Sequence, residues 1–419
     1  MAASRSATVT LMAGTIENLS DRTYHWLKRA QRRLLASDYA ELRLRQGWLR
    51  PPPDAAFGEF IVPVMPDQGA IRSVVVFKPD EIGDAVHALP ALTELRRQLP
   101  QARFFLLCRP LTRPLYERSA LFDEIATFEP GSKLRASSRS LRQALGRLSV
   151  REFDLSVYLR TNPTTFRRFM RIPARARLHP IDPRMRSTSP YQAPVSLWTT
   201  ERRHQALQLL EIVSLLTRRS YSFDDVRYPD LHWTDEDKQA VERVFGTDDP
   251  APFVVVHPFA KEETRRYPPE FWPPLLQALR DELGVALVSI GGPEDESLAE
   301  LPGLVQMEGK LTIGETGYLL SRAAGFVGNL SGPAHLAAAV GAPTVTIMSG
   351  NSLPVEWAPL GDSLVVRADV PCSPCHRRVC PGYGLACLRE LTPERISGQI
   401  VSFLGARVPQ HATPVPTGL

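Results

Sequence analysis

Two segments, one near each end of the chain, share one pattern: an apolar run, a turn containing glycine, then a second apolar run of helical composition. The first reads Val74-Val-Val-Phe-Lys-Pro-Asp-Glu-Ile-Gly83-Asp84 and continues as Ala-Val-His-Ala-Leu-Pro90. The second reads Gly328-Asn-Leu-Ser331-Gly332-Pro-Ala-His335-Leu-Ala-Ala-Ala339. Continuous apolar runs rich in β-branched residues are typical of strands buried on both faces of a parallel sheet. The pattern predicts strand–turn–helix units of an α/β fold.

The two turns differ in charge. In both, backbone N–H groups at a helix N-terminus favour phosphate or another anion. Only the first also places a carboxylate, that of Asp84, at the helix start. The first segment therefore suits the handling of a proton, and the second suits the binding of negative charge.

Strand and helix patterns alternate along most of the chain, in two series separated by a polar stretch at residues 222–249. Residues 161–200 are rich in Arg, Pro, Ser and Thr and indicate loops with short helices. Two such series predict two doubly wound domains, with the ligand beyond the carboxyl ends of the strands, in the cleft between them. We expect strands at residues 73–77, 102–108, within 122–128, and at 154–159, 252–256, 285–291, 325–328 and 343–348. We expect helices at residues 84–99, 134–148, 204–217, 271–283, 313–324, 334–340 and 393–404.

The length of 419 residues exceeds what one core fills, so more than one domain is expected. Residues 1–70 are interpreted as a basic helical N-terminal extension, with a helical pattern at 16–46 that ends before Pro51. That helix either packs on the protein through its apolar side or lies on anionic lipid. Residues 71–235 and 236–419 are interpreted as the two Rossmann-like domains, the second carrying a cysteine-rich loop and a closing helix.

The composition, 43% hydrophobic and 23% charged, is that of a soluble globular protein. A formal charge of +5 suits anionic small molecules or an anionic membrane surface, and is too weak to indicate nucleic acid. The sequence contains no run of 18 apolar residues and its first residues are too polar for a secretory signal. A cytoplasmic location is expected, with peripheral contact at the inner face of the cytoplasmic membrane as an option.

Four motifs together carry a resemblance to a known family. The first segment, completed by Leu89-Pro90-Ala91, resembles the N-terminal signature of the glycosyltransferase family 9 heptosyltransferases. The second resembles that family's donor-site pattern, Ser/Thr-Gly, two residues, then His-Leu-Ala-Ala-Ala. Two further matches lie between them, in order: His257-Pro-Phe-Ala with Arg265-Arg-Tyr-Pro268, and Gly291-Gly-Pro-Glu-Asp-Glu296. The resemblance covers about residues 71–405 and is closest to heptosyltransferase II-like members.

The resemblance implies a GT-B fold, in which two Rossmann-like domains face each other across a cleft. It implies transfer of a sugar, typically heptose, from an ADP-linked donor to a lipopolysaccharide-core or related glycan acceptor. The expected partners are thus an ADP-sugar and a glycolipid or glycan, without nucleic acid. The transfer inverts the anomeric centre in a single displacement, with no cofactor or divalent metal required.

The resemblance also implies roles for individual residues. Asp84 is the expected general base, for which the alternative is a structural N-cap carboxylate. Arg265 is expected to bind the donor diphosphate with help from Lys261, where the alternative is two solvated cations. Four more donor-site residues and the turn glycine complete the expected site: Ser331 and Gly332 at the diphosphate, His335 at a phosphate or the sugar, Glu294 (with Glu296) at the ribose, and Gly83. For His335 the alternative is a structural residue of an apolar helix.

One position departs from the family pattern. Many family members carry Asp immediately before Ser/Thr-Gly, where this chain has Leu330. Two alternatives therefore stay open: a non-catalytic sugar-nucleotide-binding or scaffold protein, and a GT-B enzyme with a different donor or acceptor. The Arg-rich residues 160–186 favour the second, as a groove for an acidic glycan, unless they form a solvated loop.

Four of the five cysteines, Cys372, Cys375, Cys380 and Cys387, follow the spacing C-x2-C-x4-C-x6-C. Four thiolates this close are able to bind zinc or an iron–sulfur cluster. The alternative is a set of free or partly paired thiols. A metal here would be structural, because it would hold the loop before the last helix and take no part in transfer.

Overall fold

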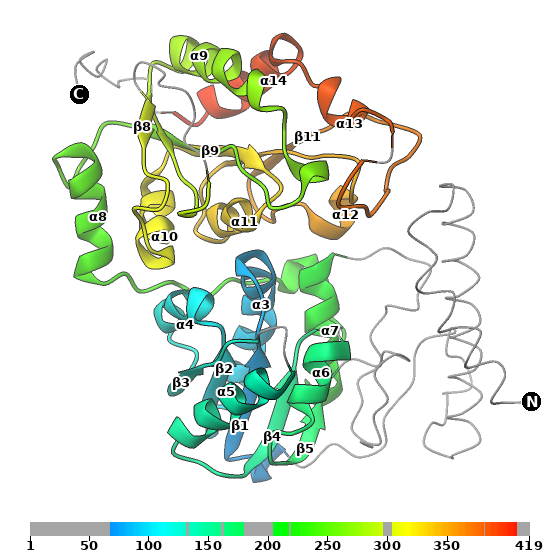
Figure 1. The fold of residues 1–419 in the computed structure, drawn as a ribbon. Helices are drawn as coiled ribbons and strands as arrows, with labels where there is room; N and C mark the ends of the chain where they lie inside the picture. The colour runs from blue at the N-terminus through cyan, green and yellow to red at the C-terminus, as the bar shows by residue number, and fades with distance from the viewer. Residues whose placement is uncertain are drawn as a thin grey trace, which may run out of the picture.

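The computed structural model describes residues 68–130, 134–160, 163–179, 204–217, 219–295, 304–380 and 382–408. Two α/β halves, each built on one parallel sheet, lie one above the other in Figure 1. The helix expected at residues 16–46 and the Arg-rich stretch beyond residue 179 lie outside the described residues.

The first sheet has five parallel strands in the order β3-β2-β1-β4-β5. Its central strand is buried on both faces, as its β-branched run predicts, and Val74 and Val76 face a different apolar cluster from Val75 and Phe77. Helices α3, α4 and α7 contribute to the first cluster, and α5 and α6 to the second. The strands are β1 Ser73–Lys78, β2 Arg103–Cys108, β3 Glu124–Thr127, β4 Phe153–Tyr158 and β5 Ala174–Leu178. The helices are α3 Ile82–Gln98, α4 Arg113–Arg118, α5 Leu134–Arg147, α6 Pro163–Phe169 and α7 Gln205–Thr217.

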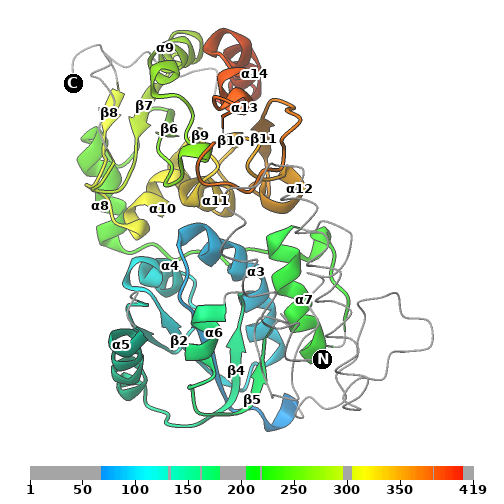
Figure 2. The ribbon, with the colours of Figure 1, turned by 45° about the vertical axis from the view of Figure 1, so that its right-hand side comes forward.

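The second sheet has six parallel strands in the order β11-β10-β9-β6-β7-β8. Helices α9 and α14 cover one face, while α10 and α11 cover the face turned toward the first half (Figure 2). The strands are β6 Phe253–His257, β7 Ala286–Ser289, β8 Leu304–Gln306, β9 Gly325–Asn329, β10 Thr344–Ile347 and β11 Ser363–Val366. The helices are α8 Asp235–Phe245, α9 Trp272–Leu283, α10 Ile313–Arg322, α11 Gly332–Ala339, α12 Pro354–Trp357, α13 Ala386–Arg389 and α14 Pro393–Gly405.

Both sheets have the strand order of a doubly wound fold. The chain builds the first sheet from β1 to one edge and then from β4 to the other edge, and it builds the second sheet in the same way from β6 and β9. The chain reverses its winding direction between β1 and β4, and again between β6 and β9. Ligands of such folds bind beyond the carboxyl ends of the strands at these switch points. The expectation of two doubly wound α/β domains is confirmed.

The two halves meet where α3 packs against α11. Two glycines permit this close approach: a Cβ on Gly332 would lie 2.9 Å from Cβ of Ile82, and one on Gly83 would lie 3.1 Å from Cδ2 of His335. A second contact joins Arg118 of α4 to Asp237 of α8 through two hydrogen bonds of 2.8 and 2.9 Å. The apolar core is continuous across the junction.

Several elements were not predicted. Residues 222–249, interpreted as a polar connection, contain α8, which begins at a Thr234 capping box and ends at Gly246 with φ of 71°. The proposed boundary between residues 235 and 236 falls at the start of this helix. Short strands β5, β8 and β11 were also missed, since none has a long apolar run. Among the described residues, no helix is both long and apolar enough to cross a membrane.

Candidate active site

Asp84 lies in the first turn of α3, just beyond the carboxyl end of β1. The N-cap residue of α3 is Glu81, so Asp84 does not cap this helix, contrary to the structural alternative. Its side chain is half-buried, and a helix N-terminus favours a carboxylate. The first half therefore presents an anionic oxygen at the switch point of its sheet.

A buried charge cluster, not predicted from the sequence, lies beside this turn. Lys78 ends β1 with 2% exposure; its ammonium donates to the carbonyl of Leu159 at 3.0 Å and pairs with the fully buried Asp80. Arg160, which follows β4, pairs with the same carboxylate. Burial lowers the pKa of Lys78 to about 7, the charge of Asp84 opposes this shift, and that of Arg160 adds to it. The cluster joins the two strand ends beneath Asp84.

In the second half, hydrogen bonds made by the side chains of Ser331 and Asn329 join the ends of β6 and β9. The hydroxyl of Ser331 lies 3.0 Å from Nδ1 of His257 and makes no capping bond to α11. The amide of Asn329 donates to the carbonyl of Pro258 at 2.7 Å and accepts from the backbone N–H of Tyr267 at 3.0 Å. We call residues 258–268 the donor loop. These bonds hold its start and its end against β9.

The donor loop carries both expected cations. Arg265 lies in a short 3-10 helix with a side chain 34% exposed, and its Nε lies 3.2 Å from the Glu262 carboxylate. Lys261 is 88% exposed, and its ammonium lies 3.7 Å from the carboxylate of Glu81, the N-cap residue of α3. The loop therefore reaches from the second half to the turn that carries Asp84.

The turn after β7 lies against the same loop. A Cβ on Gly291 would lie 2.9 Å from the ring of Phe259, which shows how closely turn and loop approach. Asp295 folds back to accept from the N–H of Gly292 at 2.7 Å. Glu294 is exposed, and Glu296 lies outside the described residues.

Three buried histidines meet between the halves. The ring of His87, from α3, has its centroid 4.2 Å from that of His335 and 5.2 Å from that of His204. Within the described part of the chain, neither ring nitrogen of His87 has a hydrogen-bond partner. Burial lowers the pKa of His335 to about 3, and the charges of His204 and Arg265 act in the same direction. His335 therefore enters this site as a neutral ring.

Leu330 is 4% exposed and belongs to the apolar interior. Its two neighbours bond the end of β6 and the residue after it: Asn329 donates to the carbonyl of Pro258, and the hydroxyl of Ser331 bonds the ring of His257. The structure places no carboxylate in this turn, since residues 325–339 contain no acidic residue.

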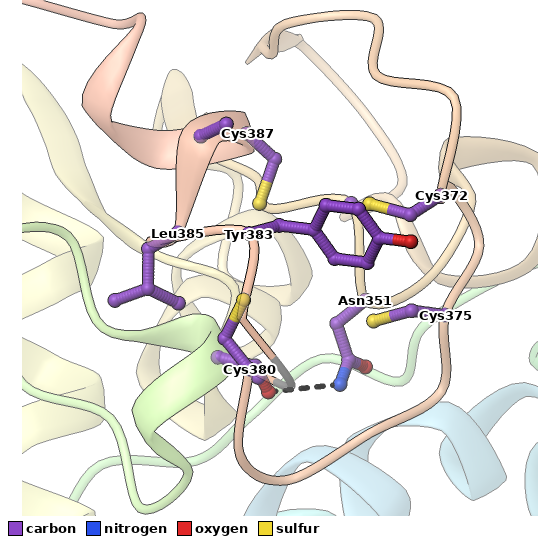
Figure 3. A pocket seen from close by; sticks show the side chains of 10 residues that line it. Asn351, Cys372, Cys375, Cys380, Tyr383, Leu385 and Cys387 are labelled. Atoms are coloured by element: carbon purple, nitrogen blue, oxygen red, sulfur yellow. Dashed lines mark hydrogen bonds between the residues drawn. The ribbon is translucent and has the colours of Figure 1, made fainter. Parts of the chain in front are cut away.

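The four clustered cysteines surround a cavity of about 20 Å³, with Thr264, Asn351 and Tyr383 also on its wall (Figure 3). None of the four forms a disulfide bond within the described residues, and burial raises the pKa of Cys375 and of Cys387. Thiolates are suitable ligands for zinc or iron. However, no three His, Cys, Asp or Glu side chains of the described residues form a group that could hold a metal ion.

Several residues of this site were not predicted from the sequence. Lys78, Asp80 and His87 lie within or next to the first segment, and their signal was polar residues inside an otherwise apolar unit. Asn329 is the last residue of β9, and Asn351 lies four residues beyond the end of β10, both at the edge of the sheet where ligands bind. A search for polar residues at and shortly after the end of each strand pattern would have found both.

Comparison with solved structures defines the class of fold. The glycosyl transferase family 9 protein from Veillonella parvula DSM 2008 matches with a TM-score of 0.66 at 17% identity, over 80% of this chain and 97% of that one. The Escherichia coli ADP-heptose lipopolysaccharide heptosyltransferase II gives 0.60 at 19% identity, over 79% and 98%. An E. coli heptosyltransferase solved with ADP gives 0.56 at 16%, over 79% and 99%. The fold is that of the GT-B glycosyltransferases.

Sequence comparison defines the family. The model of glycosyltransferase family 9 (heptosyltransferase) matches residues 175–385. The E. coli lipopolysaccharide heptosyltransferase 3 is 28% identical over 122 residues, which are 27% of this chain and 35% of that protein. The chain belongs to glycosyltransferase family 9. This match spans about a third of that relative's length, so the donor and the acceptor of this protein do not follow from it.

Proposed function

We propose that the protein is an inverting glycosyltransferase that moves a heptose from an ADP-linked donor to a hydroxyl of a lipopolysaccharide-core or related glycan. One observation carries this proposal: the turns that hold Asp84 and Ser331 face each other between the halves, where Gly83 approaches His335. Such a transfer needs a proton acceptor on one side and an anion-binding site on the other. Family membership and relatives named for ADP-heptose support the choice of donor.

In the proposed reaction, Asp84 accepts the proton of the acceptor hydroxyl as its oxygen attacks the anomeric carbon. The bond from that carbon to the diphosphate oxygen breaks as the new bond forms, and ADP leaves with the electron pair. Attack opposite the leaving group inverts the anomeric configuration. A positioned base of this kind contributes about 10²- to 10⁴-fold to the rate.

The second half offsets the charge that develops on the leaving diphosphate. Arg265 and Lys261 supply two cations from one loop, and the start of α11 supplies backbone N–H groups at Gly332. The Ser331 hydroxyl, held by His257, adds a donor of fixed position. Preorganised donors aimed at a developing anion are usually the largest contribution to catalysis.

His335 acts in this proposal as a neutral hydrogen-bond donor, because burial lowers its pKa to about 3 and it carries no charge near neutral pH. Its ring packs against His87, and we propose that it lies at the boundary between diphosphate and sugar. Glu294, exposed in the turn after β7, is proposed to bind the ribose hydroxyls of the nucleotide.

Transfer is proposed to need no cofactor. For the cysteine pocket the sequence left two alternatives open: a structural metal, or free or partly paired thiols. Elemental analysis of the purified protein separates them. One zinc or iron per chain, lost in Cys380→Ser, supports a structural metal. Four thiols that titrate freely, with no metal above trace level, support free thiols.

A glycolipid acceptor implies contact with a membrane, for which residues 1–67 are the proposed element. Co-sedimentation with anionic phosphatidylglycerol vesicles, compared with neutral phosphatidylcholine, tests this. Equal sedimentation of the full chain and a chain lacking residues 1–67 would exclude that role.

The deciding experiment measures donor binding by calorimetry and donor hydrolysis in a panel led by ADP-heptose, for the wild type and Asp84→Ala. Tight ADP-heptose binding in both, with turnover only in the wild type, is the expected result. Binding without turnover in either would favour the non-catalytic alternative. Preference for another sugar nucleotide would favour a GT-B enzyme with a different donor.

A further inference from the structure

The donor loop is bonded to the cysteine-rich loop, residues 370–387. The backbone N–H of Thr264 donates to the carbonyl of Arg378 at 3.4 Å, and its hydroxyl donates to the carbonyl of Arg377. Glu262, which pairs with Arg265, also lies 3.4 Å from Nε of Arg378. The two loops therefore form one hydrogen-bonded unit next to the proposed diphosphate site.

Asn351 joins the members of this unit. It follows β10, is 4% exposed and lies on the wall of the cysteine cavity (Figure 3). Its side-chain amide donates to the Thr264 hydroxyl at 3.0 Å and to the Arg377 carbonyl. Its backbone carbonyl accepts from the N–H of His376 at 2.9 Å. One buried side chain thus contacts both loops from the end of a central strand.

The remaining polar atom of that side chain faces Arg265. Oδ1 of Asn351 lies 3.4 Å from Nε and 3.5 Å from Nη2 of the guanidinium. Glu262 approaches the same Nε at 3.2 Å. A guanidinium is a planar fork, so contacts along its Nε edge leave the Nη1 edge for a planar or tetrahedral anion.

We propose that Asn351 is a positioning residue for donor binding, holding the Nε edge of Arg265 so that the opposite edge faces the donor diphosphate. This inference rests on the proposed diphosphate-binding role of Arg265. Asn351 does not touch the donor; it fixes the side chain that does. It also bonds the donor loop and the cysteine-rich loop to each other.

A double-mutant cycle on ADP binding, measured by calorimetry, tests the proposal with Asn351→Ala and Arg265→Ala. Asn351→Ala is expected to weaken ADP binding about tenfold, the size typical of losing a hydrogen bond to a charged group. In the Arg265→Ala background, the same change is expected to cost less than about twofold, because Asn351 then has no guanidinium to hold. The Michaelis constant for the donor is expected to rise more than kcat falls.

Ser352→Ala is the matched control, since Ser352 is the next residue, is 2% exposed, and its hydroxyl has no hydrogen-bond partner within the described residues. It is expected to bind ADP like the wild type. If Asn351→Ala does not fold, Asn351→Ser replaces it, since serine is too short to reach Arg265.

The outcomes separate this inference from the proposed function. A wild type that binds neither ADP nor inorganic diphosphate overturns both. A wild type that binds ADP while Asn351→Ala loses the same factor in both backgrounds, or loses nothing, overturns only the role of Asn351. A tenfold loss that disappears with Arg265→Ala supports it.

Discussion

Substitution of Gly332 by alanine tests whether the close approach of the two halves is needed for activity. The new Cβ would lie 2.9 Å from Cβ and 3.2 Å from Cγ2 of Ile82, and 3.3 Å from the backbone nitrogen of Gly83. Carbon atoms in favourable contact lie about 3.5–4.0 Å apart, so the methyl group is about 0.6–1.1 Å too close. Both obstructing residues belong to the start of α3, and neither the Gly83 nitrogen nor Cβ of Ile82, which is attached directly to the backbone, can rotate away.

The expected magnitude follows from where this strain is relieved. Overpacking of this kind costs about 1–3 kcal/mol. Because the clash lies between the halves, moving α11 away from α3 relieves it without unfolding either sheet. The cost then falls on the equilibrium between apposed and separated halves, whose constant drops about 5- to 150-fold. We expect kcat/KM to fall by up to that factor, while the unfolding midpoint and ADP affinity, which depends mainly on the second half, change little.

The assay is ADP-heptose turnover, with ADP binding measured in parallel. Gly398→Ala in α14 is the matched control, because a Cβ there meets nothing within 4 Å, and its activity is expected to equal the wild type. Ile82→Gly removes the atoms that clash, so it is expected to restore part of the activity in the Gly332→Ala background although it costs activity alone. Wild-type turnover in Gly332→Ala, or a loss that Ile82→Gly leaves unchanged, would refute the reasoning.

Three further predictions concern single side chains. Asp84→Asn keeps the shape but removes the base; kcat is expected to fall about 10²- to 10⁴-fold with ADP affinity unchanged, and a smaller loss in a transfer assay argues against Asp84 as the base. Burial holds the pKa of His87 well below 6.5 in the folded chain. Below about pH 6.5 this histidine therefore binds a proton in the unfolded chain but not in the folded one, so the free energy of unfolding falls as the pH drops. His87→Phe keeps a ring beside His335 and is expected to flatten this dependence by up to about 1.4 kcal/mol per pH unit, checked by urea unfolding at about pH 7 and 5; an unchanged slope contradicts it. Leu330→Asp places a carboxylate in the apolar interior and is expected to destabilise the fold by about 3 kcal/mol or more without faster turnover; a stable, more active variant, by thermal unfolding and donor assay, contradicts this.

The architecture was predictable because buried parallel strands have a simple sequence pattern. The β-branched run before Gly83 predicts a strand at residues 73–77, and β1 spans Ser73–Lys78. Edge strands are different: β5 reads Ala-Arg-Ala-Arg-Leu, an alternation too short to distinguish from a loop. Helix α8 was missed although its signal was present, since Thr234 and Asp237 form a capping box of the ordinary sequence type.

The site was predictable only where it coincides with motifs. Those motifs named Asp84, Arg265 and Ser331, and the structure brings their segments together across the junction. The bond from Lys78 to the Leu159 carbonyl and the pairing of Arg160 with Asp80 depend on β1 lying beside β4, a pairing between segments far apart in the sequence. Single-chain periodicity carries no information about which strands become neighbours, so such pairs appear only once the strand order is known.

The two halves use one topology for opposite electrostatic purposes, and this asymmetry bears on Leu330. Beyond β1, the carboxylate of Asp84 lies in the first turn of α3, and Lys78 carries the opposite charge nearby. Beyond β6 and β9, burial keeps His257 and His335 neutral, and the donor loop adds the cations Arg265, which pairs with Glu262, and Lys261. A carboxylate at position 330 would repel a diphosphate bound at the adjoining start of α11. An apolar residue there removes that repulsion, so Leu330 is expected to favour nucleotide binding and to change the choice of sugar, whose hydroxyls lose an acceptor.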